Sequence, residues 1–254
     1  MNPPEPAQSH DLPPLRTNWL DTARGFGIIL VVLGHVLRGL VSVHVLTWTG
    51  VTKFFDGWIY TFHMPLFFFL SGLLLFKSMK SSWKGFIWGK VRTIAYPYFV
   101  WSAITIAIKS VLGSLTSHPY HLSDLPLILY QPIDQFWFLY VLFLLFLAVS
   151  ALLKLGAKPW VVLSLAVLFY CGILPVPIQW GILFETRMFA IYFSLGVCIG
   201  WARDLTSLSR IHVGLLLFII GSGLALSSLG GLPQLSERGA LMPLLALAGT
   251  AAFV

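Results

Sequence analysis

The chain has 254 residues, of which 57% are hydrophobic and 10% are charged. Soluble domains carry roughly 25% charged residues, so this composition excludes a water-soluble globule, a disordered chain, collagen and a coiled coil. Two Cys exclude a disulfide scaffold. The formal net charge of +7 would suggest nucleic acid as a partner of a soluble protein, but in membrane proteins Lys and Arg collect in cytoplasmic loops. We therefore expect an all-α, polytopic bundle in a lipid bilayer, with no nucleic-acid partner.

The first 18 residues are rich in Pro and polar side chains and are predicted to form a disordered cytoplasmic tail. The first apolar run contains His35 and Arg38 and has no cleavage site of small residues, so it is a retained helix rather than a signal peptide. Residues 19–254 are then expected to form one transmembrane domain. Its last apolar run stops at Val254 without a polar tail, so we expect a domain truncated at its C-terminus.

Apolar runs of bilayer-spanning length follow one another along this domain. They are Phe26–Val45, Trp58–Phe76, Ile94–Leu112, Phe136–Leu153, Trp160–Val176, Ile182–Trp201, Ile211–Leu229 and an eighth that starts at Ala240. The runs are continuous rather than alternating, which favours helices over a transmembrane barrel. The sequence therefore predicts seven to eight transmembrane helices.

Basic residues lie in alternate loops. The loop between the second and third runs holds Lys77, Lys80, Lys84, Lys90 and Arg92, whereas residues 113–135 and 177–181 contain no Lys or Arg. The positive-inside rule then predicts a cytoplasmic N-terminus. We expect a multi-pass protein of the cell inner membrane. On charge pattern alone, the basic cluster is better explained by topology and contact with anionic lipid than by a site for a phosphate-bearing ligand.

Four ionisable residues share one face of the first helix: Asp21, Arg24, His35 and Arg38. At about 100° per residue they form a single polar stripe, in which His35 lies about 16 Å along the axis from Arg24. Ionisable groups inside a bilayer are costly and usually functional, so we expect the stripe to face a polar cavity. His35 is a candidate general base for a substrate hydroxyl. The alternative is a histidine that only bonds a neighbouring helix.

Two further places carry polar side chains near predicted outer helix ends. His63 is either solvated at the interface or part of a site, and the nearby Pro65 is expected to start the second helix. Glu185 and Arg187 either pair with each other or line the outer mouth of a cavity. Nucleotide-binding, metal-binding and serine-hydrolase motifs are missing from the sequence.

Three segments in order resemble the acyltransferase family 3 membrane proteins, in particular the fucose 4-O-acetylase-like branch. The first runs from Leu20 to His35 and contains the Arg-x10-His pattern formed by Arg24 and His35. The second is Phe-His-Met-Pro-Leu-Phe-Phe-Phe-Leu-Ser-Gly, which ends at Gly72, and the third is the basic run that leads from Lys90 to Pro97-Tyr98. Later matches are Phe-Trp-Phe-Leu at 136–139 and Phe-Ser-Leu-Gly at 193–196. Members of this family usually have about ten helices.

The resemblance implies transfer of an acetyl group from cytosolic acetyl-CoA to a hydroxyl of a cell-surface or lipid-linked glycan. His35 would take the hydroxyl proton, and Arg24 would hold a CoA phosphate or stabilise developing negative charge. Lys90 and Arg92 would hold the CoA phosphates. The acceptor would be contacted by His63, Arg187 and Arg38. No metal and no permanently bound cofactor is expected, and the oligomeric state is left open.

Two other functional classes fit the polar stripe. One is a transporter or flippase of an anionic lipid-linked sugar, and the other is a membrane subunit without a site of its own. An acyltransferase needs acetyl-CoA and a transporter does not, so a requirement for acetyl-CoA distinguishes the acyltransferase from the transporter. A subunit without a site would tolerate replacement of the stripe.

Overall fold

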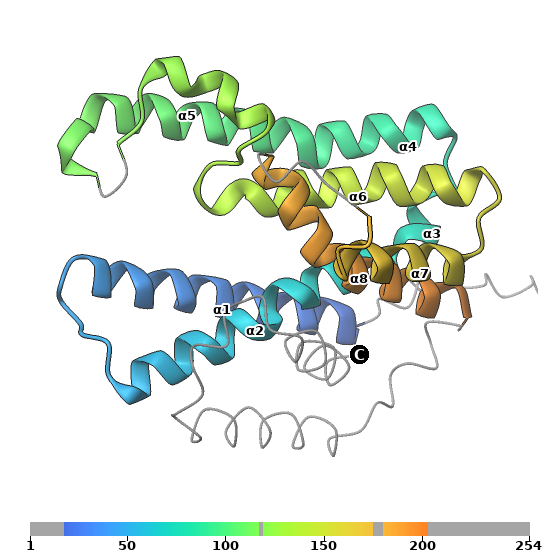
Figure 1. Ribbon diagram of the computed structural model, residues 1–254, viewed down its shortest axis with the longest axis horizontal. Helices are drawn as coiled ribbons and strands as arrows, with labels where there is room; N and C mark the ends of the chain where they lie inside the picture. Colours follow the sequence, from blue (N-terminus) through green and yellow to red (C-terminus); the bar gives the residue numbers. More distant parts are fainter. Residues whose placement is uncertain (1–17, 117–118, 175–179, 203–254) are drawn as a thin grey trace, which may run out of the picture.

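A computed structural model describes residues 18–116, 119–174 and 180–202, all connected through helices and loops without a strand (Figure 1). The prediction of an all-helical protein is therefore confirmed for this part of the chain. The α-helices are α1 (Asn18–Ser42), α2 (Gly50–Leu73), α3 (Leu75–Ser78), α4 (Trp83–Lys90), α5 (Tyr96–Leu112), α6 (Trp137–Lys154), α7 (Pro159–Tyr170) and α8 (Gly181–Ala202). One π-helix, η1 (Val91–Ala95), and three 3-10 helices, η2 (Gly113–Leu115), η3 (Leu122–Leu129) and η4 (Asp134–Phe136), complete the described elements.

Four helical stretches of the described residues are long and apolar enough to cross a membrane, as expected of an integral membrane protein. They are Leu20–Ser42, Trp83–Leu112, Leu122–Lys154 and Gly181–Ala202. Helices α2 and α7 overlap the predicted runs Trp58–Phe76 and Trp160–Val176. Helix α7 ends at Tyr170 and is shorter than the run predicted for it. The seventh and eighth predicted runs and the tail at residues 1–17 lie outside the described residues, so the total of seven to eight helices stays a prediction.

Helices α1 and α2 form an antiparallel hairpin, seen side by side in Figure 1. The buried positions of α1 are three or four residues apart, which is the spacing of one helical face: Leu20, Ala23, Gly27, Leu30 and Gly34. The two glycines on this face leave room for aromatic rings of α2, because a Cβ at Gly34 would lie 3.0 Å from a ring carbon of Tyr60. The hairpin therefore brings the polar stripe of α1 beside α2.

Helix α2 begins earlier than the apolar run predicts. Thr49 caps it, with its hydroxyl accepting from the Thr52 amide while the Thr52 hydroxyl accepts from the Thr49 amide. The helix therefore begins with residues 50–57, which include Lys53 and Asp56 and precede the predicted apolar run. Pro65 consequently lies inside α2, and the prediction that it starts the helix was wrong.

Helix α8 connects the hairpin to the remaining helices and crosses between the two groups in Figure 1. It packs closely on α2 through glycines, because a Cβ at Gly72 would meet the Phe193 carbonyl and one at Gly196 would meet the Phe69 carbonyl. On its other side it packs against α6 and α7. The main core forms here around aromatic side chains, with the rings of Phe146 and Phe193 5.1 Å apart.

Helices α4 and α5 continue one another through the π-helix η1, whereas the apolar run predicts a helix that starts only at Ile94. Pro97 has no amide hydrogen to donate to the preceding turn, and its ring crowds that turn's carbonyl. The turn is widened instead, with the Tyr96 amide donating to the Val91 carbonyl five residues back. Lys90, the last residue of α4, is thereby placed at the side of the bundle that faces α6.

The segment between α5 and α6 is held against the ends of these helices. Lys109 and Asp134 form an ion pair of 2.7 Å between Nζ and Oδ2. The hydroxyl of Tyr98 donates to the Ile128 carbonyl, and that of Tyr140 donates to the Leu129 carbonyl at 3.1 Å. These contacts fix η3 over the α5–α6 end of the bundle.

Candidate functional site

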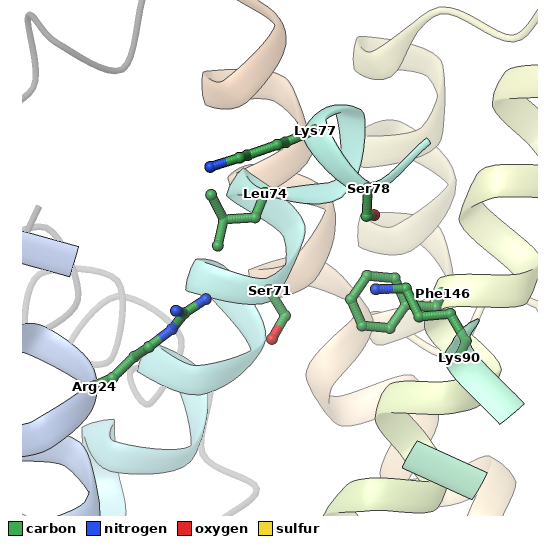
Figure 2. A pocket seen from close by; sticks show the side chains of 7 residues that line it. All are labelled: Arg24, Ser71, Leu74, Lys77, Ser78, Lys90 and Phe146. Carbon is green, nitrogen blue, oxygen red and sulfur yellow. The ribbon is translucent and has the colours of Figure 1, made fainter. Parts of the chain in front are cut away.

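A cavity of about 310 Å³ lies where the N-terminal part of α1 meets the end of α2, and Figure 2 shows the side chains around it. Residues from five elements and the α2–α3 junction line it: Arg24, Ser71, Leu74, Lys77, Ser78, Lys90 and Phe146. In Figure 2, Arg24 and Lys90 extend from opposite sides toward the space beside Ser71. The fold therefore joins two predicted site residues, which are far apart in sequence, in one cavity.

Three of the lining side chains are cationic and none is acidic. Lys90 is partly buried, with its Nζ 3.6 Å from the centroid of the Phe146 ring. Arg24 pairs loosely with the exposed Asp21, at 3.7 Å between NH1 and Oδ1, and Lys77 is exposed. An Arg and two Lys around one space make a site for an anion with several charged oxygens.

Arg92, which was predicted to accompany Lys90, is exposed and does not line this cavity. It lies in the widened turn of η1, two residues beyond Lys90. Lys77 from α3, rather than Arg92, lines the cavity together with Lys90. The sequence signal for Lys77 was its membership of the basic cluster, which did not single it out from its neighbours.

A second group of polar residues lies farther along the hairpin, around the ring of Tyr60 on α2. The guanidinium carbon of Arg38 lies 3.3 Å from the ring centroid. The same guanidinium forms two bonds with the Asp56 carboxylate, from Nε at 2.6 Å and from NH2 at 3.0 Å. Asp56 and Tyr60 are thus parts of this group that sequence reasoning missed, although an acidic residue early in an apolar hairpin is itself an unusual feature.

Both histidines of the predicted site contact the same tyrosine ring. The ring of His35 stands edge-on to Tyr60 with centroids 6.5 Å apart, and that of His63 does so at 4.9 Å. His35 is exposed, whereas His63 is 2% exposed. The Nδ1 of His63 lies 2.6 Å from the carbonyl oxygen of Ile59, which can only accept, so Nδ1 donates and Nε2 is the basic nitrogen of the neutral ring.

The polar stripe of α1 is thus divided between the cavity and the group around Tyr60. Arg24 lines the cavity, while His35 and Arg38 lie outside it, in the group around Tyr60. These three side chains lie beside the buried face of α1, and the single functional face expected of Asp21, Arg24, His35 and Arg38 stays a prediction. The cavity lined by Arg24 does not extend to His35 or Arg38.

Arg187, predicted to contact an acceptor, binds the end of α7. Its Nε and NH2 donate to the carbonyl of Tyr170 at 3.2 and 3.0 Å. Gly172 follows α7 with a φ of 77°, where a side chain would be strained and would press on the Arg187 guanidinium. Within the described ranges, no group of three or more His, Cys, Asp or Glu could hold a metal ion.

A family model described as an acyltransferase domain matches residues 17–254. The nodulation protein NolL of Mesorhizobium japonicum is 25% identical, over 72% of this chain and 56% of that protein. The chain therefore spans little more than half the length of this curated relative. No solved structure shows a significant match.

Proposed function

Because the chain belongs to the acyltransferase family whose domain model it matches over residues 17–254, we propose that it is a membrane-embedded O-acyltransferase. It transfers an acetyl group from acetyl-CoA to a hydroxyl of a cell-surface or lipid-linked glycan, in the manner of the fucose 4-O-acetylase-like branch. The observation that carries the proposal is the cavity in which Arg24, Lys77 and Lys90 converge without an acidic partner among the lining residues.

The cavity suits the phosphate groups of the donor. Guanidinium and ammonium groups bind phosphate oxygens through charge-assisted hydrogen bonds, which are stronger where water is partly excluded. Lys90 is partly buried and packs on Phe146, so it is assigned the strongest phosphate contact. Arg24 and Lys77 complete the site from α1 and α3. A donor-binding role for Arg92 stays a prediction.

The distance between the two polar groups supports the same assignment. Arg24 and His35 are eleven residues apart on one continuous helix, which corresponds to about 16 Å along its axis. An extended pantetheine arm can span a separation of this order. Phosphates bound at Arg24 would therefore allow the acetyl thioester to reach the level of His35.

His35 is assigned the role of general base, which its exposure makes possible because an acceptor can reach the imidazole. The imidazole takes the proton of the acceptor hydroxyl while the hydroxyl oxygen attacks the carbonyl carbon of the thioester. The new C–O ester bond forms, the C–S bond breaks, and the proton passes from His35 to the departing CoA sulfur. Atoms and charge balance without any further reactant.

The positive-inside rule supports the placing of the cavity at the cytoplasmic side of the inner membrane, because Lys77 and Lys90 belong to the predicted cytoplasmic loop. Donor from the cytosol would then enter at the cavity, and the acceptor would approach His35. Acceptor contacts by His63, Arg187 and Arg38 stay predictions, since these side chains are respectively buried, bonded to Tyr170 and paired with Asp56.

The direct test is mass spectrometry of the surface glycans of the host with the gene, without it and with His35→Ala. The proposal expects acetyl esters that disappear both without the gene and in the variant, while the variant protein remains at its normal level in the membrane. Glycans of identical acetyl content in all three strains would contradict it. A protein that transports a glycan would instead change the amount of surface glycan rather than its acetylation.

A further inference from the structure

We infer that Asp56 is a positioning residue for the proposed acyl transfer, because it fixes Arg38 across Tyr60 and thereby fixes the ring against which His35 rests. The inference depends on the proposed function, since it assigns a role in the step that His35 performs. It adds to that function a residue pair between α1 and α2 that does not touch the reacting atoms.

The contact between Asp56 and Arg38 is geometrically restrictive. Both carboxylate oxygens are engaged, Oδ1 by Nε and Oδ2 by NH2, so the guanidinium plane is fixed as well as its position. The Asp56 side chain is 18% exposed and that of Arg38 is 42% exposed. Ionisable side chains within a membrane-spanning hairpin are costly and usually have a function.

The fixed guanidinium in turn restrains Tyr60. Arg38 covers one face of the ring at 3.3 Å, and the buried His63 meets the ring edge. Gly34 allows α1 to approach the ring, because any side chain at this position would press on it. The ring is thus held between two helices on several sides.

His35 is exposed, as is Arg38, and the ring of Tyr60 lies edge-on to its imidazole. His35 and Arg38 lie on adjacent turns of α1 and meet the same ring. Loss of the Asp56 carboxylate would remove both hydrogen bonds that fix the Arg38 guanidinium. The Tyr60 ring would then be less restrained, and so would the His35 imidazole beside it. The donor cavity around Lys90 lies at the other end of the hairpin and would be unaffected.

The test uses the full chain in lipid nanodiscs, with radiolabelled acetyl-CoA as the donor and membranes of the deletion strain as the source of acceptor. Asp56→Asn removes the charge at nearly constant volume. The inference expects kcat to fall on the order of 10- to 100-fold, which is the effect of a small misplacement of a catalytic group, with KM for acetyl-CoA unchanged. Asp56→Glu, which keeps the carboxylate, should recover part of the loss.

Asp134→Asn is the matched control. It breaks the Lys109–Asp134 pair, which has a comparable length of 2.7 Å and side chains 20% and 21% exposed, away from both polar groups. This variant should keep the wild-type kcat. Arg38→Gln should reproduce the Asp56→Asn loss, and the double variant should be no worse than either single variant, because the two residues act as one unit.

The inference is overturned if Asp56→Asn keeps kcat within twofold of the wild type, if Asp134→Asn lowers kcat equally, or if the losses of Asp56→Asn and Arg38→Gln multiply. Each of these results leaves the proposed function intact as long as the wild-type protein transfers acetyl and His35→Ala does not. Absence of transfer by the wild-type protein contradicts the proposed function and the inference with it.

Discussion

Lys90→Gln tests whether the cationic cavity binds the donor. The change removes one of the three positive charges that line the cavity and keeps a polar side chain. Lys90 is partly buried, and its Nζ lies over the rings of Phe146 and Phe86, at 3.6 and 5.4 Å from their centroids. Because water is partly excluded there, the loss of this charge should weaken donor binding more than the loss of an exposed one.

The size of the effect follows from the surroundings of the charge. A hydrogen bond to a charged group contributes about 1.5 to 3 kcal/mol. At about 1.4 kcal/mol for each factor of ten, the Kd for acetyl-CoA should rise about 10- to 150-fold. Lys77 is exposed and is expected to contribute roughly 0 to 1 kcal/mol, so Lys77→Gln should raise Kd by no more than about fivefold.

The assay is calorimetric titration of the purified protein with acetyl-CoA at physiological ionic strength. Lys84→Gln is a matched control, since Lys84 is an exposed lysine of α4 outside the cavity. Arg92→Gln tests the predicted donor contact of Arg92 in the same series. A Kd for Lys90→Gln within twofold of the wild type, or the same rise in Lys84→Gln, would refute the assignment of Lys90 to donor binding. The basic cluster would then be explained by membrane topology alone.

Two predictions concern helix packing. Gly196→Ala places a Cβ against the Phe69 carbonyl and should cost about 1 to 3 kcal/mol, seen as a lower Tm by tryptophan fluorescence. Gly89→Ala, whose Cβ meets nothing within 4 Å, is its control and should not lower Tm; equal Tm values would contradict the close packing of α8 on α2. Arg187→Ala should also lower Tm, because the Tyr170 carbonyl loses two donors at a cost of about 1 to 3 kcal/mol. An unchanged Tm with a raised KM for the acceptor would instead assign Arg187 to acceptor binding.

Hydropathy predicts α6 and α8 almost to the residue, because both are predominantly apolar up to their ends. It misses the start of α2, where the helix is defined by the threonine cap and passes through Lys53 and Asp56 before it becomes apolar. The joined α4–η1–α5 helix is missed for a similar reason, since its first part carries basic residues. Helix ends set by local hydrogen bonds are not visible to an average over apolar side chains.

Helical periodicity was sufficient to place Arg24, His35 and Arg38 on one face of α1, because that spacing depends on a single helix. Their partners on α2 depend on the register of the hairpin. The pairs Arg38–Asp56 and Gly34–Tyr60 belong to one register. That register can be predicted only when the ends of both helices are known. The short helix α3 that turns Lys77 toward the cavity gave no signal in the sequence at all.

In the proposed reaction, His35 accepts the proton of the acceptor hydroxyl while the donor is held at a separate cavity. Its most direct measurement is transfer of radiolabelled acetyl from acetyl-CoA to the deletion-strain membranes by purified His35→Ala protein, together with the Kd of that variant for acetyl-CoA. If His35 is the base, the variant forms no ester product and binds acetyl-CoA with the Kd of the wild type. Ester formation at the wild-type rate in His35→Ala would contradict it.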